Sequence, residues 1–179
     1  GKTSGDVGEF CLNIQEVTTD HLSTIGDCGT STPITGMNSD YNGWLSLVDD
    51  AGRLVALVRP NSFSGTGSFG LEASQYIHDG IVREDSMGTP YLDRNITINN
   101  TGNTITDADV RFYFLDTELA DLDGVALSSV GVSKYAPSST CLEAYPADIT
   151  PEYLYQSASG TIGTTRWVEV NVTGFSTFF

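Results

Sequence analysis

Apolar and polar residues alternate in short runs along much of this chain, and clusters of Gly, Ser, Thr, Asn and Asp separate the runs. A period of two places successive side chains on opposite faces, as in a half-buried β-strand. The alternation is strict over residues 91–99, where Arg94, Ile96 and Ile98 share one side. The pattern predicts strands over residues 10–14, 69–73, 77–82, 91–99 and 110–115, and others near 126–134, 153–157 and 167–173.

The strongest local signal is a β-hairpin. Apolar runs at Trp44–Val48 and Arg53–Val58 flank the turn residues 49–52, which end in a glycine that can adopt positive φ. Pro60 has no amide N–H for a ladder, so we expect it to end the second strand. Residues 24–42 are dense in Gly, Ser, Thr, Asp and Asn and are expected to form a long loop.

One stretch carries a helical pattern instead. Leu115, Leu119 and Leu122 recur at helical spacing, and Asp116 is placed to cap the N-terminus of the helix. We therefore expect an all-β fold, an antiparallel β-sandwich of the jelly-roll or immunoglobulin-like kind, with one short helix near residues 116–122. The length suits one domain over residues 1–179.

The charge balance narrows the possible partners. The chain has 23 acidic and eight basic residues and a net charge of −15, without any basic cluster. Such a surface repels nucleic acid and anionic membranes. No apolar run approaches the roughly 18 residues of a spanning helix, so we expect no membrane insertion.

The three cysteines, Cys11, Cys28 and Cys141, lack the spacing of a zinc site. We favour a disulfide between Cys11 and Cys28, because it would close a short loop and add about 3 kcal/mol of stability through the unfolded state. Pairing of either residue with Cys141 stays open, as do three buried thiols.

Catalytic motifs are weak. Residues 65–70 satisfy G-x-G-x-x-G but run into a predicted strand, whereas a dinucleotide site needs a helix there. The two histidines, His21 and His78, accompany no nucleophile motif. Carboxylates are abundant enough for glycoside hydrolase chemistry, but the sequence locates no facing pair. We expect that the chain is not an enzyme.

Calcium is a better use of the carboxylates, because it binds six to eight oxygen ligands. Acidic residues gather in two clusters. The first, at positions 107 and 109, could share a strand face, and the second, between positions 116 and 123, could present ligands from a turn. Neither follows the EF-hand order, and helix capping with a solvated face explains the second cluster better. The candidate calcium ligands are Asp107 and Asp109, and Asp116, Glu118, Asp121 and Asp123.

Three stretches and the last residues resemble an uncharacterised domain near the C-terminus of large exported proteins of the phylum Bacteroidota. The resemblance covers roughly residues 41–179 and concerns structural motifs. The stretches are residues 50–61 (DAGRLVALVRPN), 91–98 (YLDRNITI), 110–119 (VRFYFLDTEL), and 168–175 with Phe178.

This resemblance implies secretion through the type IX system and a place at the bacterial cell surface. Secreted proteins of this phylum are often O-glycosylated at Asp followed by Ser or Thr and a small or aliphatic residue. Asp85-Ser86-Met87 fits this motif, so the resemblance makes Ser86 a candidate glycosylation site of a glycoprotein.

The function that we expect is a non-catalytic structural or adhesive module. Its partners would be other surface proteins, copies of itself or glycans. The alternative is a carbohydrate-binding module, in which Tyr41, Trp44 or Trp167 stacks on a sugar ring, although the two tryptophans lie in strand patterns that more often supply core.

Overall fold

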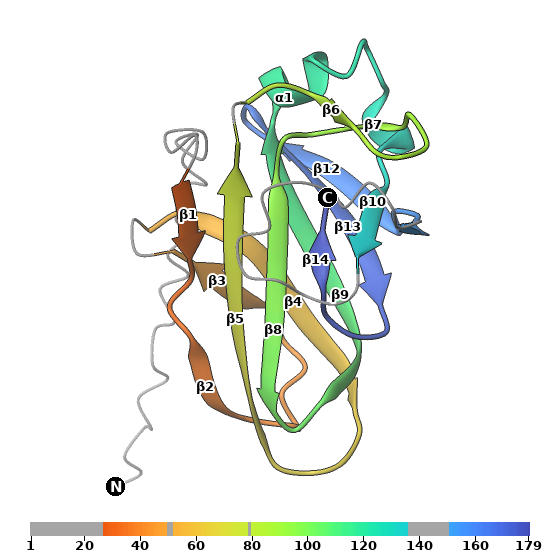
Figure 1. Cartoon of the computed structure of the whole chain (residues 1–179). Coiled ribbons are helices and arrows are strands. Elements are labelled where there is room, and N and C mark those ends of the chain that lie inside the picture. The colour runs from red at the N-terminus through yellow and green to blue at the C-terminus, as the bar shows by residue number, and fades with distance from the viewer. Residues whose placement is uncertain (1–26, 50–51, 79, 136–150) are drawn as a thin grey trace, which may run out of the picture.

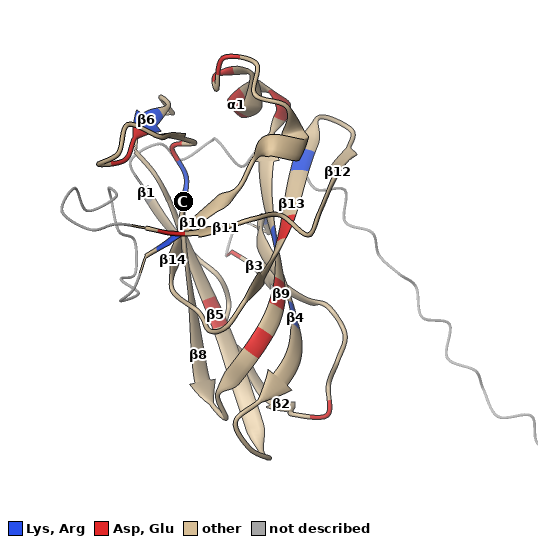
Figure 2. Cartoon of the chain, turned by 90° about the vertical axis from the view of Figure 1, so that its right-hand side faces the viewer, with Lys and Arg blue, Asp and Glu red and all other residues tan. Residues whose placement is uncertain are grey.

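The computed structural model describes residues 27–49, 52–78, 80–135 and 151–179. These residues form two antiparallel β-sheets packed face to face, one short α-helix and one 3-10 turn, η2 (Leu127–Ser129). The expected all-β antiparallel sandwich is confirmed. Figure 2 shows the two layers from the side, with the helix at one end.

The front sheet, nearer the viewer in Figure 1, has seven strands. Its order is β1 (Asp27–Thr30), β5 (Ser68–Ile77), β8 (Asn95–Gly102), β14 (Thr177–Phe178), β10 (Val132–Tyr135) and β11 (Glu152–Leu154), and β2 (Ile34–Asn38) also pairs with β5.

The rear sheet has five strands, and a separate two-stranded ribbon lies at the same end of the sandwich as the helix. The rear order is β12 (Ala158–Ile162), β13 (Thr165–Val172), β9 (Ile105–Leu115), β4 (Leu54–Phe63) and β3 (Leu45–Val48), and the ribbon is β6 (Arg83–Glu84) with β7 (Pro90–Tyr91).

The core lies between the two sheets. Alternate residues of each long strand point inward, such as Val110 and Phe112 in β9 and Ile96 and Ile98 in β8, and all four are buried. The Phe112 and Phe178 rings meet across the interface with centroids 5.1 Å apart. Burial of these apolar faces is the main force that holds the sheets together.

Strand β14 joins the two halves of the front sheet. It is only two residues long, yet it pairs with β8 on one side and β10 on the other. Thr177 lies opposite Thr97, and their hydroxyl oxygens are 2.8 Å apart. Phe178, which is 1% exposed, supplies the core contact from this strand.

At each lateral edge of the sandwich the two sheets are linked to one another, by hydrogen bonds on one side and by a short chain connection on the other. Between β1 and β2, Ser31 forms an isolated bridge to Asp49, and the Thr32 N–H donates to the Val48 carbonyl at 3.0 Å. At the other side the chain passes from β11 to β12 within three residues, 155–157. Such links limit pairing of the edges with other chains.

The predicted hairpin is confirmed by β3 and β4, and Gly52 has a φ of 79° as its turn position requires. The expectation that Pro60 ends the second strand is wrong, because β4 continues to Phe63. Pro60 pairs with β9 on one side, and β3 does not extend alongside it on the other. A residue without an N–H is tolerated at such a position, where the ladder is one-sided.

Two other local predictions are wrong. Residues 24–42 are not one loop, since β1 and β2 lie within them and pair with successive parts of β5. Their turn-rich composition is tolerated because each strand is short and lies at a sheet edge. The strand expected over residues 77–82 is not found where this stretch is described: β5 ends at Ile77, residues 78 and 80–82 belong to no strand, and Ile81 is 65% exposed. The strand predicted at residues 10–14 lies outside the described residues.

The expected short helix is α1 (Asp116–Ala120), and Asp116 is not its cap. Leu115 occupies the N-cap position, and its N–H donates to the Glu118 carboxylate at 2.6 Å. Glu118 also accepts two hydrogen bonds from Arg94, at 2.9 and 3.0 Å, and Arg94 donates to Gln75 at 2.8 Å. This buried polar network fastens the helix to β5 and to Arg94, the residue just before β8.

All seven lysines and arginines in the described residues are paired with a carboxylate. The described surface therefore offers no unmatched cation to an anionic partner.

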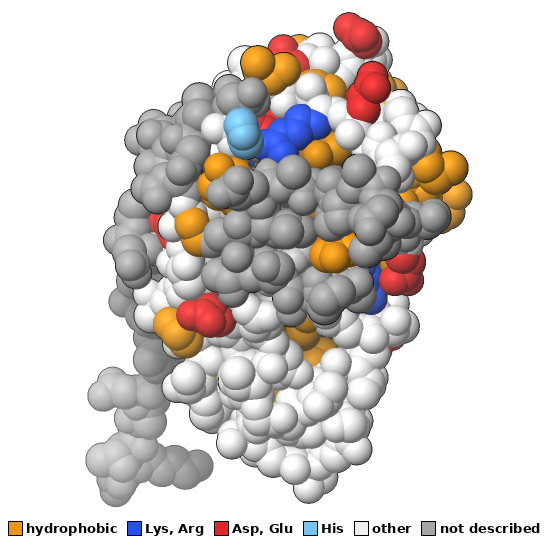
Figure 3. Space-filling view, viewed as in Figure 1, with side chains coloured by type: hydrophobic (Ala, Val, Ile, Leu, Met, Phe, Trp, Pro, Cys, Tyr) orange, Lys and Arg blue, Asp and Glu red, His pale blue; other side chains and the backbone are white. Residues whose placement is uncertain are grey.

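The end of the front face formed by the β4–β5 and β8–β9 turns is almost free of charged side chains (Figure 3). In the described segments, no helix has the length and apolarity needed to cross a membrane.

Candidate functional site

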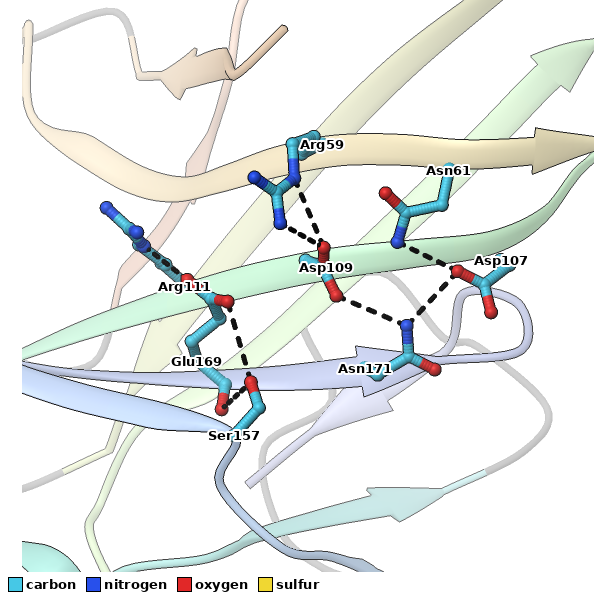
Figure 4. A network of polar contacts seen from close by, with 8 residues as sticks. All are labelled: Arg59, Asn61, Asp107, Asp109, Arg111, Ser157, Glu169 and Asn171. Carbon is cyan, nitrogen blue, oxygen red and sulfur yellow. Dashed lines mark hydrogen bonds and ion pairs between the residues drawn. The ribbon is translucent and has the colours of Figure 1, made fainter. Parts of the chain in front are cut away.

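The outer face of the rear sheet carries a network of charged and amide side chains (Figure 4), and two tryptophans pack against its arginines. The register produces it: Arg59 of β4 lies opposite Asp109 of β9, which lies opposite Asn171 of β13. Two positions along, Arg111 lies opposite Glu169. Because side chains of alternate residues share a face, these five groups meet on one surface.

Two arginines and two tryptophans of this face form what we call the Trp–Arg stack. The Arg111 guanidinium carbon lies 4.4 Å from the Trp44 ring centroid and 4.5 Å from that of Trp167. Arg59 lies 4.8 Å from the Trp44 ring. These are cation–π distances, and a planar guanidinium packs well on an indole.

A glycine makes room for one of the indoles. A Cβ atom at Gly160 of β12 would lie 2.6 Å from Cζ2 of Trp167 and 2.8 Å from its Nε1. The Trp167 ring therefore lies directly over the backbone of Gly160, which is opposite it in the β12–β13 ladder. Any larger residue at position 160 would displace the ring.

The carboxylates of the network are held by specific donors. Arg59 donates to Asp109 from Nη2 at 2.5 Å and from Nε at 3.1 Å. Asn171 donates to Asp107 at 3.1 Å and to Asp109 at 3.2 Å, and Asn61 donates to Asp107 at 2.8 Å. The amides thus hold two like charges side by side.

These contacts change the acid–base behaviour of the face. Burial disfavours the charged form of Asp109, but hydrogen bonds from Arg59 and Asn171 outweigh it and keep the pKa of Asp109 below its ordinary 3.8. The same hydrogen bond raises the pKa of Arg59. Burial raises the pKa of Tyr113, which neighbours Trp167 across the ladder, although Arg111 opposes this effect.

We predict a pH-dependent contribution from Asp109. Because its folded pKa is depressed, its stabilisation is complete above the unfolded pKa and is lost as the pH falls through the folded pKa. Asp109→Asn should cost about 1 kcal/mol at neutral pH, and the difference from wild type should shrink as the pH falls below 3.8. Urea unfolding at a series of pH values measures this, and a constant difference would contradict the assignment.

Of the two predicted clusters of calcium ligands, the first lies together and the second is dispersed. Asp107 and Asp109 adjoin one another but accept the hydrogen bonds described above. Asp116 pairs with Arg166 at 2.6 Å, whereas Glu118 points inward to Arg94. Asp121 and Asp123 lie exposed in the turn after α1, where Asp123 has a φ of 52°. Among the described residues, no three acidic, His or Cys side chains are arranged to hold a metal ion. Calcium binding stays a prediction.

The predicted sugar-stacking residues are brought only partly together. Trp44 and Trp167 both belong to the Trp–Arg stack. Their strand patterns favoured a place in the core, but neither tryptophan belongs to the core cluster. Tyr41 packs against the core, and its hydroxyl donates to the Trp44 carbonyl at 3.0 Å. Arginine guanidinium groups already lie over both indoles, and Gly160 lies against Trp167, so part of the surface on which a sugar would stack is occupied.

The modification candidates fall in different regions. Ser86 is exposed in the turn of the β6–β7 ribbon, next to Asp85, which accepts hydrogen bonds from the Met87 and Thr89 N–H groups. Cys28 of β1 is disulfide-bonded. Both other cysteines, Cys11 and Cys141, lie outside the described residues, so the predicted Cys11–Cys28 pairing is untested.

Sequence reasoning missed Arg59, Arg111 and Glu169 as members of the site. Their period-two spacing within β4, β9 and β13 was visible, but the register that aligns the strands was not. Comparisons with protein-family models, curated proteins and solved structures find no match to this chain.

Proposed function

We propose that this chain is a non-catalytic adhesive module of a secreted or cell-surface bacterial protein. It attaches through the outer face of the rear sheet to other surface proteins or to further copies of itself. The observation that carries the proposal is the Trp–Arg stack, a rigid and partly exposed group of the residue types that dominate binding energy at protein interfaces.

The rigidity of the face supports a binding role. Arg111 is held between two rings and by Glu169 at 2.7 Å, and Ser157 in turn donates to the Glu169 carboxylate at 3.5 Å. A partner that docks here would meet side chains already fixed in one conformation. Binding would therefore cost little conformational entropy.

The charge pattern defines the partner's chemistry. The face combines the acidic groups Asp107, Asp109 and Glu169 with Arg59, whose side chain is 39% exposed. A complementary surface would carry amides, hydroxyls and a few basic groups. Nucleic acid does not fit, because each described cation is already matched by a carboxylate.

Glycan binding is the second candidate. Asn61 and Asn171 are exposed amides on the same sheet face as the two tryptophans, and amide–aromatic combinations suit sugar hydroxyls and ring faces. The occupied faces of the indoles weigh against stacking.

The test compares two variants that each remove one positive charge. Arg111→Met takes away the centre of the Trp–Arg stack, and Arg166→Met removes an arginine paired with Asp116 near the helix. Beads coated with wild-type protein should adhere to cells of Bacteroidota and to beads carrying the same chain. Arg111→Met should lower adhesion at least tenfold, as expected for a central interface arginine.

Arg166→Met should leave adhesion unchanged, which controls for charge. A glycan array run with the same three proteins separates the two candidates, because glycan hits lost in Arg111→Met would favour sugar binding. Equal adhesion by Arg111→Met and Arg166→Met would contradict the assignment of the outer face of the rear sheet as the binding face. Release of a reducing sugar from any array glycan would contradict a non-catalytic role.

Passage through the type IX system, glycosylation of Ser86 and calcium binding belong to the same proposal. The exposed position of Ser86 in a short turn supports modification there. Its neighbour Asp85 also receives a hydrogen bond from the Tyr153 hydroxyl at 2.6 Å, which fixes the turn. The mass of protein purified from its native host would reveal an attached glycan.

A further inference from the structure

A large apolar pocket lies between the two sheets at the end that carries α1. Its volume is about 740 Å³, within the roughly 300–1,000 Å³ range of small-molecule sites. Close-packed protein interiors leave few voids larger than a water molecule, so a space of this size is more than a packing defect. Its described lining comes from both sheets, from the β6–β7 ribbon and from the segment after the helix.

The short strands of the front sheet explain why the sheets leave this space. Strands β14, β10 and β11 have two, four and three residues. Each supplies one side chain to the core or to its margin, namely Phe178, Val132 and Leu154. These side chains face Phe112 and Phe114 of the long strand β9, and all five line the pocket. So few side chains on the front side do not fill the gap between the sheets.

The pocket has a buried part and a part that reaches the surface. Hydrocarbon from both sheets lines the buried part, whereas hydroxyl groups and aromatic rings line the exposed part. Tyr155 is 90% exposed, and Tyr153, which is 41% exposed, contacts the sulfur of Met87. A group of exposed aromatic and apolar side chains beside a pocket is typical of a binding site. The buried lining includes Ile96, Phe112, Phe114, Val168 and Phe178, and the exposed lining includes Ser128, Ser129, Tyr153 and Tyr155.

Charge in the lining selects the kind of ligand. Arg94 is the one charged residue among the lining residues that the structure describes, and it is buried. Its Nη1 donates to Gln75 at 2.8 Å, and both oxygens of Glu118 lie within 3.0 Å of its Nη2, so its charge is already neutralised. A carboxylate or an ammonium group in the pocket would lose water without gaining a counter-ion. An uncharged polar group carries a much smaller penalty.

We propose that this pocket binds an uncharged small molecule with a hydrocarbon body, such as a long-chain alcohol or a monoacylglycerol. The hydrocarbon body lies in the buried part between the sheets, and the polar end lies among the exposed hydroxyl groups. The site is separate from the outer face of the rear sheet. It can therefore be correct whether or not that face is adhesive.

Displacement of a fluorescent dye tests the selection by charge. The full chain is loaded with N-phenyl-1-naphthylamine, a neutral apolar dye, and titrated at neutral pH with 1-decanol, decanoate or decylammonium. The alcohol should displace the dye at concentrations about tenfold or more below those of either ion. Failure of all three compounds to displace the dye would overturn the proposal. A preference for decylammonium would attribute binding to the acidic surface, and a preference for decanoate would reveal a free cation, so either would also overturn it.

A measurement on the wild-type protein locates the ligand. Nuclear Overhauser contacts should join the chain protons of 1-decanol to the methyl groups of Ile96, Val132 and Val168, which line the pocket. Val58 and Ile105 are buried core residues outside this lining, and their methyl groups should show no such contact. Contacts to these two residues alone, or to none of the five at saturating alcohol, would mean that the pocket is not the site.

A pair of substitutions at one position tests whether the lining charge sets the preference. Leu154 is half-buried in the short edge strand β11 and lines the pocket. Leu154→Lys adds a cation there, and Leu154→Met is the matched control with an unbranched neutral side chain. Decanoate should displace the dye from Leu154→Lys at concentrations about tenfold lower than from Leu154→Met. Equal displacement by decanoate in the two variants would contradict the selection of an uncharged ligand by the lining.

Discussion

Glu118→Ala is expected to lower the free energy of unfolding by about 3–5 kcal/mol, the usual cost of breaking a buried ion pair by removing one partner. The Glu118 side chain is 10% exposed and that of Arg94 is 5% exposed, so the guanidinium would be left charged and without an anion. The substitution also removes the acceptor of the Leu115 N–H at the start of α1. A loss of this size is a large part of the roughly 5–15 kcal/mol of a typical domain.

Chemical denaturation monitored by tryptophan fluorescence measures the loss. Glu152→Ala is the matched control, since Glu152 is 57% exposed and its oxygen lies 3.4 Å from Lys134 Nζ. That variant should lose less than about 1 kcal/mol. The double variant Arg94→Met with Glu118→Gln should recover most of the stability, because no buried charge is left alone. Equal losses in Glu118→Ala and Glu152→Ala would refute the assigned role of the buried pair.

Phe178→Ala should destabilise the protein by about 3–5 kcal/mol, as is usual when a buried phenylalanine is truncated. Phe178 is 1% exposed and fills the space beside Phe112. It also belongs to the two-residue strand that joins β8 to β10, so the cavity would open where the front sheet has only short pairings. Thermal unfolding followed by circular dichroism gives the change in melting temperature.

Tyr155→Ala is the control for this substitution, because it also removes an aromatic ring, from a position that is 90% exposed. Its stability should stay within about 0.5 kcal/mol of wild type. A similar loss in the two variants would mean that the ring of Phe178 contributes no more than a surface ring. In that case β14 would not be the connection on which the front sheet depends.

The long strands and the hairpin could be predicted because their signals are local. Alternation over residues 110–115 and a glycine at position 52 are set by neighbours in sequence. Strand β14 gave no such signal, because two residues cannot show a period. The extension of β4 through Pro60 could not be predicted either. It depends on Pro60 having a neighbouring strand on one side only, and the sequence does not show which strands are neighbours.

The candidate site was only partly predictable for a related reason. Asp109, Trp44 and Trp167 were singled out by residue type, but Arg111 was not. Its importance comes from lying between two indoles that are 123 positions apart in the numbering, at 44 and 167. Glu118 was misplaced for the same reason: its acidic neighbours suggested a surface cluster, whereas its partner Arg94 lies 24 positions earlier.

The position of β14 in the chain has a consequence for the order of folding. The strand between β8 and β10 comes last in the sequence of strands, so the front sheet cannot be completed until residues 177–178 have been synthesised. Until then β10 and β11 have no place in the sheet, and part of the core stays open to solvent. Pairing over such sequence distances is slow. A nascent chain would therefore leave this sandwich incompletely folded until β14 emerged from the ribosome.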